Sequence, residues 1–327
     1  MSRILFVHNA PTRFVVIDRE LLARRWRVRE WYQRGKWIRL VSLARAVRRS
    51  GLVFCWFAGW HSFFPVLLAR MMGRPSIVVV GGYDVANLPE AGYGSQRGGW
   101  RRRVARAVMR MAHCLVAFSR SARQEAIVNA GIEPGKITVV YQGVPPVPAG
   151  TFSARENLVI TVGGVWRENL LRKGLRPFVR AAAHLPEARF VLVGKWYDDS
   201  IEELRRLAPA NVEFAGFVPD ERLFGLYRRA SVYVQASLHE GFGMSVAEAM
   251  MAGCVPVVTR AGALPEVVGD AGIYADSNAP GDIASAVRRA LAADGNLRRR
   301  ARDRVMKKFP LERRREELHA LVGRWLP

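Results

Sequence analysis

Two glutamates frame a loop with two glycines in the C-terminal half of the sequence. Glu240 stands directly before Gly241, Phe242 and Gly243, and Glu248 follows after seven intervening residues. Glycines let backbone N–H groups approach a ligand closely, and a helix that begins behind them offers unpaired N–H donors to a phosphate. One carboxylate can therefore meet each end of a nucleotide-linked ligand, while the backbone holds the phosphates between them.

Two apolar runs and a helix-forming segment position this loop. We expect strands at Ser231–Ala236 and Cys254–Thr259, because both runs are short, apolar and bounded by turn signals. Between them, Ser245–Ala252 has the alanine, methionine and glutamate content of a helix, and Gly253 stands where a helix commonly ends. In a parallel sheet such a unit places its loop at the carboxyl end of the first strand, where open α/β sheets bind ligands.

Glu248 has a second interpretation. Ser245 and Glu248 fit the Ser-x-x-Glu capping box, in which the glutamate only reaches back to the first N–H of the helix. The local pattern supports ligand binding and capping equally, and the surrounding context favours the ligand.

The whole stretch resembles the retaining glycosyltransferases of family 4, which have a GT-B architecture of two Rossmann-like domains facing across a cleft. The resemblance runs through Glu-Gly-Phe-Gly-Met-Ser-Val-Ala-Glu-Ala-Met at 240–250, Gly-Cys-Val-Pro-Val-Val at 253–258 and Ala-Leu-Pro-Glu-Val-Val at 263–268. It implies that Glu240 approaches the donor sugar and that Glu248 binds the ribose hydroxyls. It also implies same-face attack on the sugar, with neither a metal ion nor a side-chain nucleophile.

A second glycine-flanked segment, 163–174, carries three cations. We expect a loop here, before a helix at about 174–184, so that Arg172 and Lys173 at a helix N-terminus oppose the macrodipole until an anion binds. By resemblance, Lys173 contacts the donor diphosphate together with an arginine. Glycine and valine occupy the usual position of that arginine, which leaves Arg167 or Arg172 as the partner. The alternative is that all three cations are solvated loop charges.

Further candidate residues follow other expected strands. Gly194 and Lys195 could admit a base or phosphate, or form an ordinary turn. Val218 lies in a segment that borders the base in related enzymes or forms a simple hydrophobic turn. In the N-terminal half, Asp84 follows a strand of valine and isoleucine, and it could accept a hydrogen bond from a sugar hydroxyl or hold its own turn. The glycine-rich loop often found after the first strand in relatives does not follow His8, so the acceptor is not identified.

The candidate residues form two groups. Those expected to act on the reacting sugar and diphosphate are Asp84, Arg167, Arg172, Lys173 and Glu240. Those expected to bind the nucleotide sugar are Gly163, Gly164, Gly194, Lys195, Val218, Gly241, Phe242, Gly243, Met244, Ser245 and Glu248. No metal ligand is among them, and the nucleotide diphosphate sugar is a donor substrate, so no cofactor is expected.

Composition limits the class of protein. The 327 residues are 50% hydrophobic with a mean hydropathy near zero, which indicates a soluble globular chain long enough for two domains. Lys and Arg number 51 against 28 Asp and Glu, a net charge of +23 that attracts nucleic acid, an anionic membrane or an acidic substrate. The basic residues are spread through both halves without a nucleic-acid-binding motif, so no nucleic acid partner is expected.

The cysteines and the N-terminus favour a cytoplasmic protein. Cys55, Cys114 and Cys254 are far apart and form no CxxC pair, so the spacing supports neither a zinc site nor a disulfide framework. The first apolar run is too short for a signal-peptide core, and we expect it to form the first strand.

Alternation of apolar strands with helices predicts an α/β fold with two Rossmann-like parallel sheets. A segment rich in proline and glycine at 143–150 separates them. We expect an N-terminal acceptor-binding domain at 1–146, a C-terminal nucleotide-sugar-binding domain at 151–305, and a terminal helix at 306–327. By resemblance, that helix packs back on the N-terminal domain, and Gly81–Asp84 lines the inter-domain cleft.

Two stretches raise the question of membrane contact. The apolar run 52–69 approaches the length of a membrane span, but glycine, histidine and proline interrupt it, so strand, loop and helix fit better. At 97–111, apolar residues gather on one helical face and arginines mostly lie off it. This helix suits an anionic membrane surface, but burial of the stripe within its own domain is the favoured alternative.

These observations predict an enzyme. It is a retaining, metal-independent hexosyltransferase that moves a hexose from a UDP- or GDP-sugar to an acceptor hydroxyl, for example of a lipid-linked or cell-surface glycan precursor. We expect it in the cytoplasm, with peripheral attachment to the inner membrane as a further expectation. The alternatives are a GT-B sugar-nucleotide epimerase and a non-enzymatic basic protein that binds nucleic acid or membrane.

Overall fold

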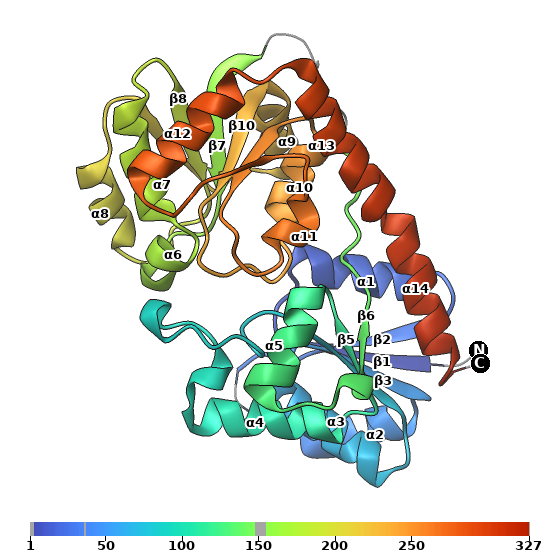
Figure 1. The fold of residues 1–327 in the computed structure, drawn as a ribbon. Coiled ribbons are helices and arrows are strands. Elements are labelled where there is room, and N and C mark those ends of the chain that lie inside the picture. The colour runs from blue at the N-terminus through green and yellow to red at the C-terminus, as the bar shows by residue number, and fades with distance from the viewer. Residues whose placement is uncertain (1–2, 36, 148–154, 327) are drawn as a thin grey trace. The chain divides into compact units, whose positions relative to one another are not determined.

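The computed structural model describes residues 3–35, 37–147 and 155–326. The chain divides into two compact units, of which the first comprises Met1–Gly143 with Leu311–Pro327 and the second Val144–Pro310. Each unit contains its own six-stranded sheet, and every strand pair in both sheets is parallel (Figure 1). The prediction of two separate Rossmann-like sheets is therefore confirmed.

The first unit has the strand order β2-β1-β3-β4-β5-β6. Its strands are β1 (Arg3–His8), β2 (Arg27–Tyr32), β3 (Leu52–Trp56), β4 (Ser76–Val80), β5 (Cys114–Ala117) and β6 (Ile137–Val139). The central strands β3 and β4 are buried along their whole length, as expected for apolar runs in a parallel sheet covered on both faces. The edge strand β2 is charged and largely exposed, which protects the edge from pairing with other chains.

Helices cover both faces of this sheet. They are α1 (Arg13–Ala23), α2 (Leu40–Arg48), α3 (Trp60–Met71), α4 (Gly99–Met111), α5 (Arg120–Ala130) and the terminal α14 (Leu311–Gly323). The chain runs from β1 to β2 in one direction and from β3 to β6 in the other, so right-handed crossovers place α1 on one face and α2–α5 on the opposite face. One core cluster accordingly joins buried residues of α2, α3, α4 and α5 to alternate residues of β1, β3, β4 and β5.

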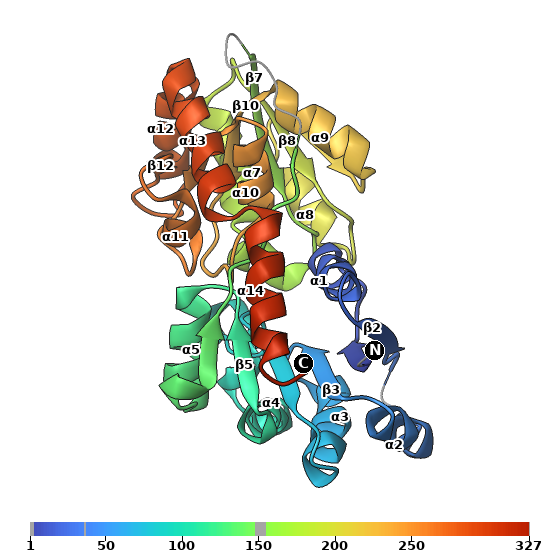
Figure 2. The same ribbon diagram turned by 90° about the vertical axis from the view of Figure 1, so that its right-hand side faces the viewer.

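The terminal helix α14 belongs to the first unit, where it lies beside α1 (Figure 2). A buried ion pair joins the two helices, because both guanidinium nitrogens Nε and Nη2 of Arg314 donate to the carboxylate of Asp18, at 2.6 and 2.7 Å. The side chains of Arg314 and Asp18 are 1% and 0% exposed. The remaining nitrogen of Arg314 donates to the carbonyls of Val140 and Tyr141, so this arginine also holds the segment after β6.

The second unit has the strand order β12-β11-β10-β7-β8-β9. Its strands are β7 (Glu156–Val162), β8 (Arg189–Val193), β9 (Val212–Gly216), β10 (Ala230–Gln235), β11 (Val255–Val258) and β12 (Ile273–Tyr274). Its helices are α6 (Arg167–Arg172), α7 (Leu175–Ala181), α8 (Ser200–Leu207), α9 (Asp220–Arg229), α10 (Met244–Met251), α11 (Leu264–Val268), α12 (Pro280–Leu291) and α13 (Gly295–Lys308). From β7 the chain first builds the sheet outward to β9 and then returns to build it from β10 to β12. The direction therefore reverses between β7 and β10, and loops after these two strands lie where such sheets bind ligands.

The structure agrees with one local expectation from the sequence and differs from another. The apolar run 52–69 divides into β3 and the start of α3, and no helix within the described residues has both the length and the apolar character to span a bilayer. The segment 163–174, expected to be a loop, contains the short helix α6. The helix α2 begins at Leu40, so Trp37 lies in the connection from β2.

Candidate active site

The loops after β7 and β10 bring one lysine and one glutamate together. Nζ of Lys173 lies 3.2 Å from Oε2 of Glu240, across 67 positions of sequence. Their side chains are 17% and 14% exposed, so the ion pair is mostly shielded from water yet open to a ligand. The structure thus joins the two residues to which the sequence assigned contacts with the donor sugar and with the diphosphate.

Neighbouring cations hold Glu240 in its charged form. Burial raises the pKa of its carboxyl, but the charges of Lys173 and Arg172 and the hydrogen bond from Lys173 outweigh burial and leave the pKa below its ordinary value. Glu240 is therefore ionised at neutral pH, and positive charge accumulates around it.

The helix α6 changes the electrostatic interpretation of Arg172 and Lys173. We expected both cations just before a helix at about 174–184, and α7 does begin at Leu175 with Gly174 as its N-terminal cap, but the two cations also end α6, with Lys173 as its C-terminal cap. Cations at the end of a helix are stabilised by its partial negative charge. The N–H of Leu238 donates to the carbonyl of Arg172 at 2.8 Å, which ties the end of α6 to the loop that carries Glu240.

The two candidate arginines lie at opposite ends of α6. Arg172 is buried and donates from Nε and Nη2 to Oδ1 of Asn169, at 3.0 and 2.6 Å. Arg167 is exposed at the start of the helix, where its backbone N–H donates to Asp198. The charge of Arg172 is among the causes of the lowered pKa of Glu240, so this arginine acts on the same carboxylate as Lys173.

Two glycines allow the loops around Glu240 to approach so closely. Gly174 has φ +65°, and a Cβ there would lie 2.0 Å from the carbonyl oxygen of Ala236 at the end of β10. Gly262 has φ +53°, and a Cβ there would lie 2.2 Å from the carbonyl oxygen of Glu240 itself. Both positions need a residue without a side chain, for reasons of backbone conformation and of space.

A chain of buried polar side chains on β10 leads to Glu240. The phenol of Tyr233 donates to Gln235 at 2.7 Å, and Nε2 of Gln235 lies 2.7 Å from Oγ of Ser237 and 3.5 Å from Oε2 of Glu240. Sequence analysis missed this network. Its signal was a tyrosine and a glutamine at alternate positions of a strand that is otherwise apolar, since buried polar groups require partners.

Glu248 lies inside α10 and does not form the capping box. The helix begins at Met244 after the left-handed Gly243 (φ 94°), so Ser245 is its second residue, and no side chain caps the first turn. The capping interpretation is therefore wrong. Glu248 is 4% exposed, and its charge together with that of Glu240 adds to the effect of burial in raising the pKa of the Tyr233 phenol. Both carboxylates thus act on one phenol.

The remaining residues of the glycine loop have different surroundings. Phe242 is buried, and its ring packs against that of Phe309 at 5.3 Å, so its side chain serves packing. Gly241, Met244 and Ser245 are partly exposed at the start of α10. Ligand contacts by Phe242 are therefore restricted to its backbone.

Residues after β7 and β8 form a joined pair of loops. Gly194 has φ +157°, and a Cβ there would lie 2.0 Å from the carbonyl oxygen of Gly163. A Cβ at Gly164 would meet the rings of Trp166 and Tyr197, which contact each other edge to face at 5.3 Å. These glycines therefore let the loops pack together, whatever they do for a ligand.

Exposed side chains stand beside these loops. Lys195 is exposed, and its Nζ lies 5.3 Å from the centre of the Tyr197 ring, which is 62% exposed. After β9, Val218 is buried at 5% exposure, whereas the adjacent Phe217 is 76% exposed. Sequence analysis named Val218 for the base, but the structure presents the aromatic rings of Phe217 and Tyr197 instead.

Asp84 lies in the first unit and holds its own turn. Its carboxylate accepts hydrogen bonds from the backbone N–H groups of Ala58, Gly81 and Gly82, at 3.0 to 3.2 Å. The side chain is 3% exposed, and burial raises its pKa despite these bonds. This geometry is that of the structural alternative, so we do not assign Asp84 to the site.

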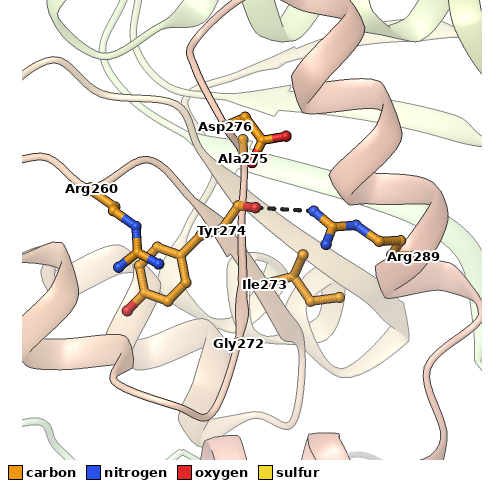
Figure 3. A pocket seen from close by; sticks show the side chains of 7 residues that line it. All are labelled: Arg260, Gly272, Ile273, Tyr274, Ala275, Asp276 and Arg289. Carbon is orange, nitrogen blue, oxygen red and sulfur yellow. Dashed lines mark hydrogen bonds between the residues drawn. The ribbon is translucent and has the colours of Figure 1, made fainter.

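A separate hollow of about 430 Å³ lies beside the edge strand β12 (Figure 3). The guanidinium of Arg260 lies over the ring of Tyr274 at 4.2 Å, and Arg289 donates to the Tyr274 carbonyl at 3.1 Å. The described residues that line it include none of the candidates from the sequence. Among the described residues, no group of three or more His, Cys, Asp or Glu side chains is placed to hold a metal ion.

Comparison with known families covers both units. Residues 156–293 match the family described as glycosyl transferases group 1, and residues 2–143 match the glycosyl transferase 4-like domain. The chain belongs to the group 1 glycosyltransferases. Both matches fall on the sheets described above, and the two-unit architecture of this group 1 glycosyltransferase is the GT-B fold expected from the sequence.

Curated relatives of this group 1 glycosyltransferase match it over part of their length. It is 40% identical to the O-antigen chain mannosyltransferase B of Escherichia coli over 116 residues, which are 33% of this chain and 30% of that protein. It is 31% identical to the MMP alpha-(1->4)-mannosyltransferase of Mycolicibacterium hassiacum over 193 residues, 56% of this chain and 44% of that one. A phosphatidylinositol N-acetylglucosaminyltransferase protein of Arabidopsis thaliana is 25% identical over 184 residues, 54% of this chain and 41% of its own. The matches therefore span less than half of each of these three relatives.

Solved structures resemble this group 1 glycosyltransferase over nearly its whole length. The Anabaena protein Alr3699/HepE in complex with UDP-glucose has a TM-score of 0.79 at 16% identity, covering 99% of this chain and 100% of that one. A sucrose-phosphate synthase from Thermosynechococcus elongatus has a TM-score of 0.77 at 18% identity, with 99% of both chains covered. At these identities the likeness establishes the fold.

Proposed function

We propose that this glycosyltransferase moves a hexose from a UDP- or GDP-linked sugar to an acceptor hydroxyl with retention of configuration. The observation that carries the proposal is the ion pair of Lys173 and Glu240 at the point where the second sheet changes direction. A shielded ion pair at that edge offers one charge of each sign to a ligand that itself has an anionic diphosphate and a polyhydroxylated sugar.

Binding of the donor is proposed to exchange the partners of this pair. In the structure Lys173 and Glu240 neutralise each other at 3.2 Å. The donor diphosphate takes Lys173 and the first-turn N–H groups of α10, while sugar hydroxyls donate to the freed Glu240 carboxylate. Arg172 supplies further positive charge nearby, because it acts on Glu240 from the end of α6. Each charge thus leaves one partner and gains another, which limits the cost of desolvation.

The proposed reaction breaks the bond between the sugar C1 and the diphosphate oxygen. The electron pair leaves with the diphosphate, and the acceptor oxygen bonds to C1 on the face that the diphosphate vacates. The acceptor proton passes to the departing diphosphate, so no side-chain nucleophile takes part. Lys173, Arg172 and the start of α10 stabilise the negative charge that grows on the leaving group, and the proposal needs no metal ion for this purpose.

Glu248 is proposed to bind the ribose hydroxyls. It lies on α10 between the glycine loop and the core, and it acts with Glu240 on the Tyr233 phenol. The two carboxylates can therefore serve the two ends of one donor. Phe217 and Tyr197, exposed after β9 and β8, are the side chains that we assign to the nucleobase, since aromatic faces stack on bases irrespective of their identity.

The acceptor is proposed to be a membrane-associated glycan precursor, met at the cytoplasmic face of a membrane. Support comes from relatives whose names refer to phosphatidylinositol and to the O-antigen chain. The chain itself supports it through a net charge of +23. The first unit would bind the acceptor and the second the donor.

The test begins with thermal shifts of the parent protein with UDP-, GDP- and ADP-sugars, because a ligand of the folded state raises its apparent stability. The stabilising donor is then incubated with candidate acceptors, and the anomeric configuration of the product is determined by NMR. The variant Glu240→Gln should lower turnover. Its matched control is Glu221→Gln, the same chemical change at an exposed position at the start of α9. Isomerisation of the donor without any acceptor product would instead identify an epimerase.

A further inference from the structure

The outer side of the helix layer α2–α4 in the first unit combines positive charge with exposed apolar side chains. Residues 31–124, which contain these helices, hold sixteen arginines or lysines against two acidic residues, the buried Asp84 and the exposed Glu90. The three helices are adjacent, since α3 packs against both α2 and α4, and they lie together in both views (Figure 1 and Figure 2). A surface with such an excess of basic residues is complementary to an extended anionic partner.

Trp37 is the most exposed large side chain of this surface. It is 94% exposed and lies in the connection between β2 and α2. The buried Gln33 holds this connection, because its Nε2 donates to the carbonyl of Trp37 at 2.7 Å and to those of Arg34 and Gly35 at 3.4 Å. The tryptophan is thus presented by an ordered backbone, although its ring packs against almost nothing within the chain.

The first turn of α2, which follows Trp37 in the chain, adds two exposed apolar side chains. Leu40 is 47% exposed and Val41 is 66% exposed, while Leu43 on the inner side of the helix is fully buried. Arg39 and Arg45 are exposed on the same helix, so cations surround the apolar side chains. The helix therefore buries one apolar face in the core of its unit and exposes a smaller apolar group to the outside. Such a helix can lie at the boundary between lipid headgroups and acyl chains.

The same combination continues onto the neighbouring helices. Met71 at the end of α3 is 74% exposed, and Trp100 at the start of α4 is 57% exposed. The guanidinium of Arg101 lies 5.9 Å from the Trp100 ring centre. The rest of the α4 stripe is buried or partly buried in the core of the first unit, as the alternative from the sequence stated. The structure therefore moves the centre of this surface from α4 to Trp37 and α2.

We propose that this face seats on an anionic lipid bilayer, with Trp37, Leu40 and Val41 at the level of the headgroups and the arginines on anionic lipids. Tryptophan is enriched at that level, because one side of its ring system is apolar while its N–H seeks water. A nucleic acid would match the charge but not the aliphatic Leu40 and Val41, which have no face to stack on a base. The inference extends the proposed membrane location and does not depend on sugar transfer.

The experiment compares co-sedimentation of the full chain with vesicles of pure phosphatidylcholine and with vesicles of equal parts phosphatidylcholine and phosphatidylglycerol. The main variant is Trp37→Ser, which removes a side chain without internal packing. Its matched control is Met306→Ser, since Met306 is 49% exposed on α13 in the second unit. Arg45→Gln tests the charge, with Arg300→Gln on α13 as control.

We expect the parent to bind only the anionic vesicles. Trp37→Ser should weaken that binding about tenfold, the effect of losing one large apolar side chain from the interface. Arg45→Gln should weaken binding to the anionic vesicles about fivefold, and this effect should be smaller at high salt. Both controls should bind as the parent does. The thermal shift that the nucleotide sugar causes should be the same in Trp37→Ser and in the parent. Donor binding and vesicle binding are thus measured independently of each other.

Three results would overturn the proposal: no binding of the parent to anionic vesicles, equal binding by Trp37→Ser and Met306→Ser, or equal binding to neutral and anionic vesicles. Retention of a single-stranded RNA by both parent and Trp37→Ser, without vesicle binding, would assign the charged face to nucleic acid.

Discussion

We propose that Lys173 and Glu240 exchange partners when the donor binds. Variants of these two residues should therefore differ in their affinity for a nucleoside diphosphate. Lys173→Met keeps an unbranched side chain, shorter by one atom, and removes its charge. Glu240→Gln keeps the shape of the carboxylate and removes its charge, which leaves Lys173 without its competitor at 3.2 Å. The free diphosphate should therefore bind more weakly to the first variant and no more weakly to the second.

The magnitude follows from the partial burial of the pair. With side-chain exposures of 17% and 14%, Lys173 offers a charge-assisted hydrogen bond to the diphosphate. Such bonds contribute about 1.5–3 kcal/mol, so Lys173→Met should weaken UDP or GDP about 10- to 100-fold. Loss of Glu240 should leave this affinity equal or higher, but should lower turnover about 100- to 1,000-fold, because its contact to the sugar is proposed to matter in the transition state.

Lys173→Met should also alter the pH dependence. Burial raises the pKa of Glu240, and Lys173 is the first of the charges that lower it. In the parent the lowered pKa stabilises the fold at pH values above the ordinary 4.5, and this contribution is lost as the pH falls through the folded-state pKa. Without Lys173 the folded-state pKa rises, so this contribution shrinks and Lys173→Met should lose less stability on acidification than the parent does.

Isothermal titration of UDP and GDP into parent and variants measures the affinities, and melting temperatures across acidic pH measure the linkage. Urea unfolding at neutral pH confirms that each variant is folded. Equal diphosphate affinity for Lys173→Met and parent would refute the proposed site. So would a loss in Glu240→Gln as large as that in Lys173→Met, since both charges would then act only through the fold.

Three further predictions concern single positions. Glu248→Gln should weaken the donor and the free nucleoside diphosphate alike, as titrations would show, and a changed melting temperature with unchanged affinity would contradict the ribose contact. Arg314→Met leaves the buried carboxylate of Asp18 uncompensated and should lower the free energy of unfolding by about 3–5 kcal/mol in urea titrations; the double variant Asp18→Asn with Arg314→Met should recover part of it. Gly174→Ala should cost more than the roughly 1–2 kcal/mol of a left-handed conformation, because its Cβ meets a carbonyl oxygen at 2.0 Å; unaltered stability would show that the loop relaxes freely.

The sequence predicted the sheets well because each unit repeats short valine-rich runs between helices. The strand of valine and isoleucine at 76–80 and the run at 189–193 are both buried strands, as their composition indicated. Glu240 could be placed at the carboxyl edge of the second sheet because its loop follows a strand that the sequence predicts. The contact with Lys173 could not be predicted, since it depends on a glycine that packs against the end of β10 from another loop.

The misses have local causes. The helix α6 has only six residues between glycine-containing segments, and helices so short form through tertiary contacts more than through propensity. The capping box at Ser245 failed because Gly243 adopts a left-handed conformation and starts the helix one residue earlier. Sequence analysis gave Trp37 no role, because its exposure depends on the connection that the side chain of Gln33 holds.

The return of α14 to the first unit has a consequence for biosynthesis. Arg314 and Asp18 are 296 positions apart, so the aspartate waits for its arginine until almost the whole chain has left the ribosome. Residues 144–310, in contrast, contain the whole of their own unit and can complete it earlier. The usual order, in which the N-terminal domain folds first during synthesis, is therefore expected to be reversed. A nascent chain stalled before α14 would carry a complete second unit joined to a first unit that has all its strands but lacks the helix that neutralises its buried aspartate.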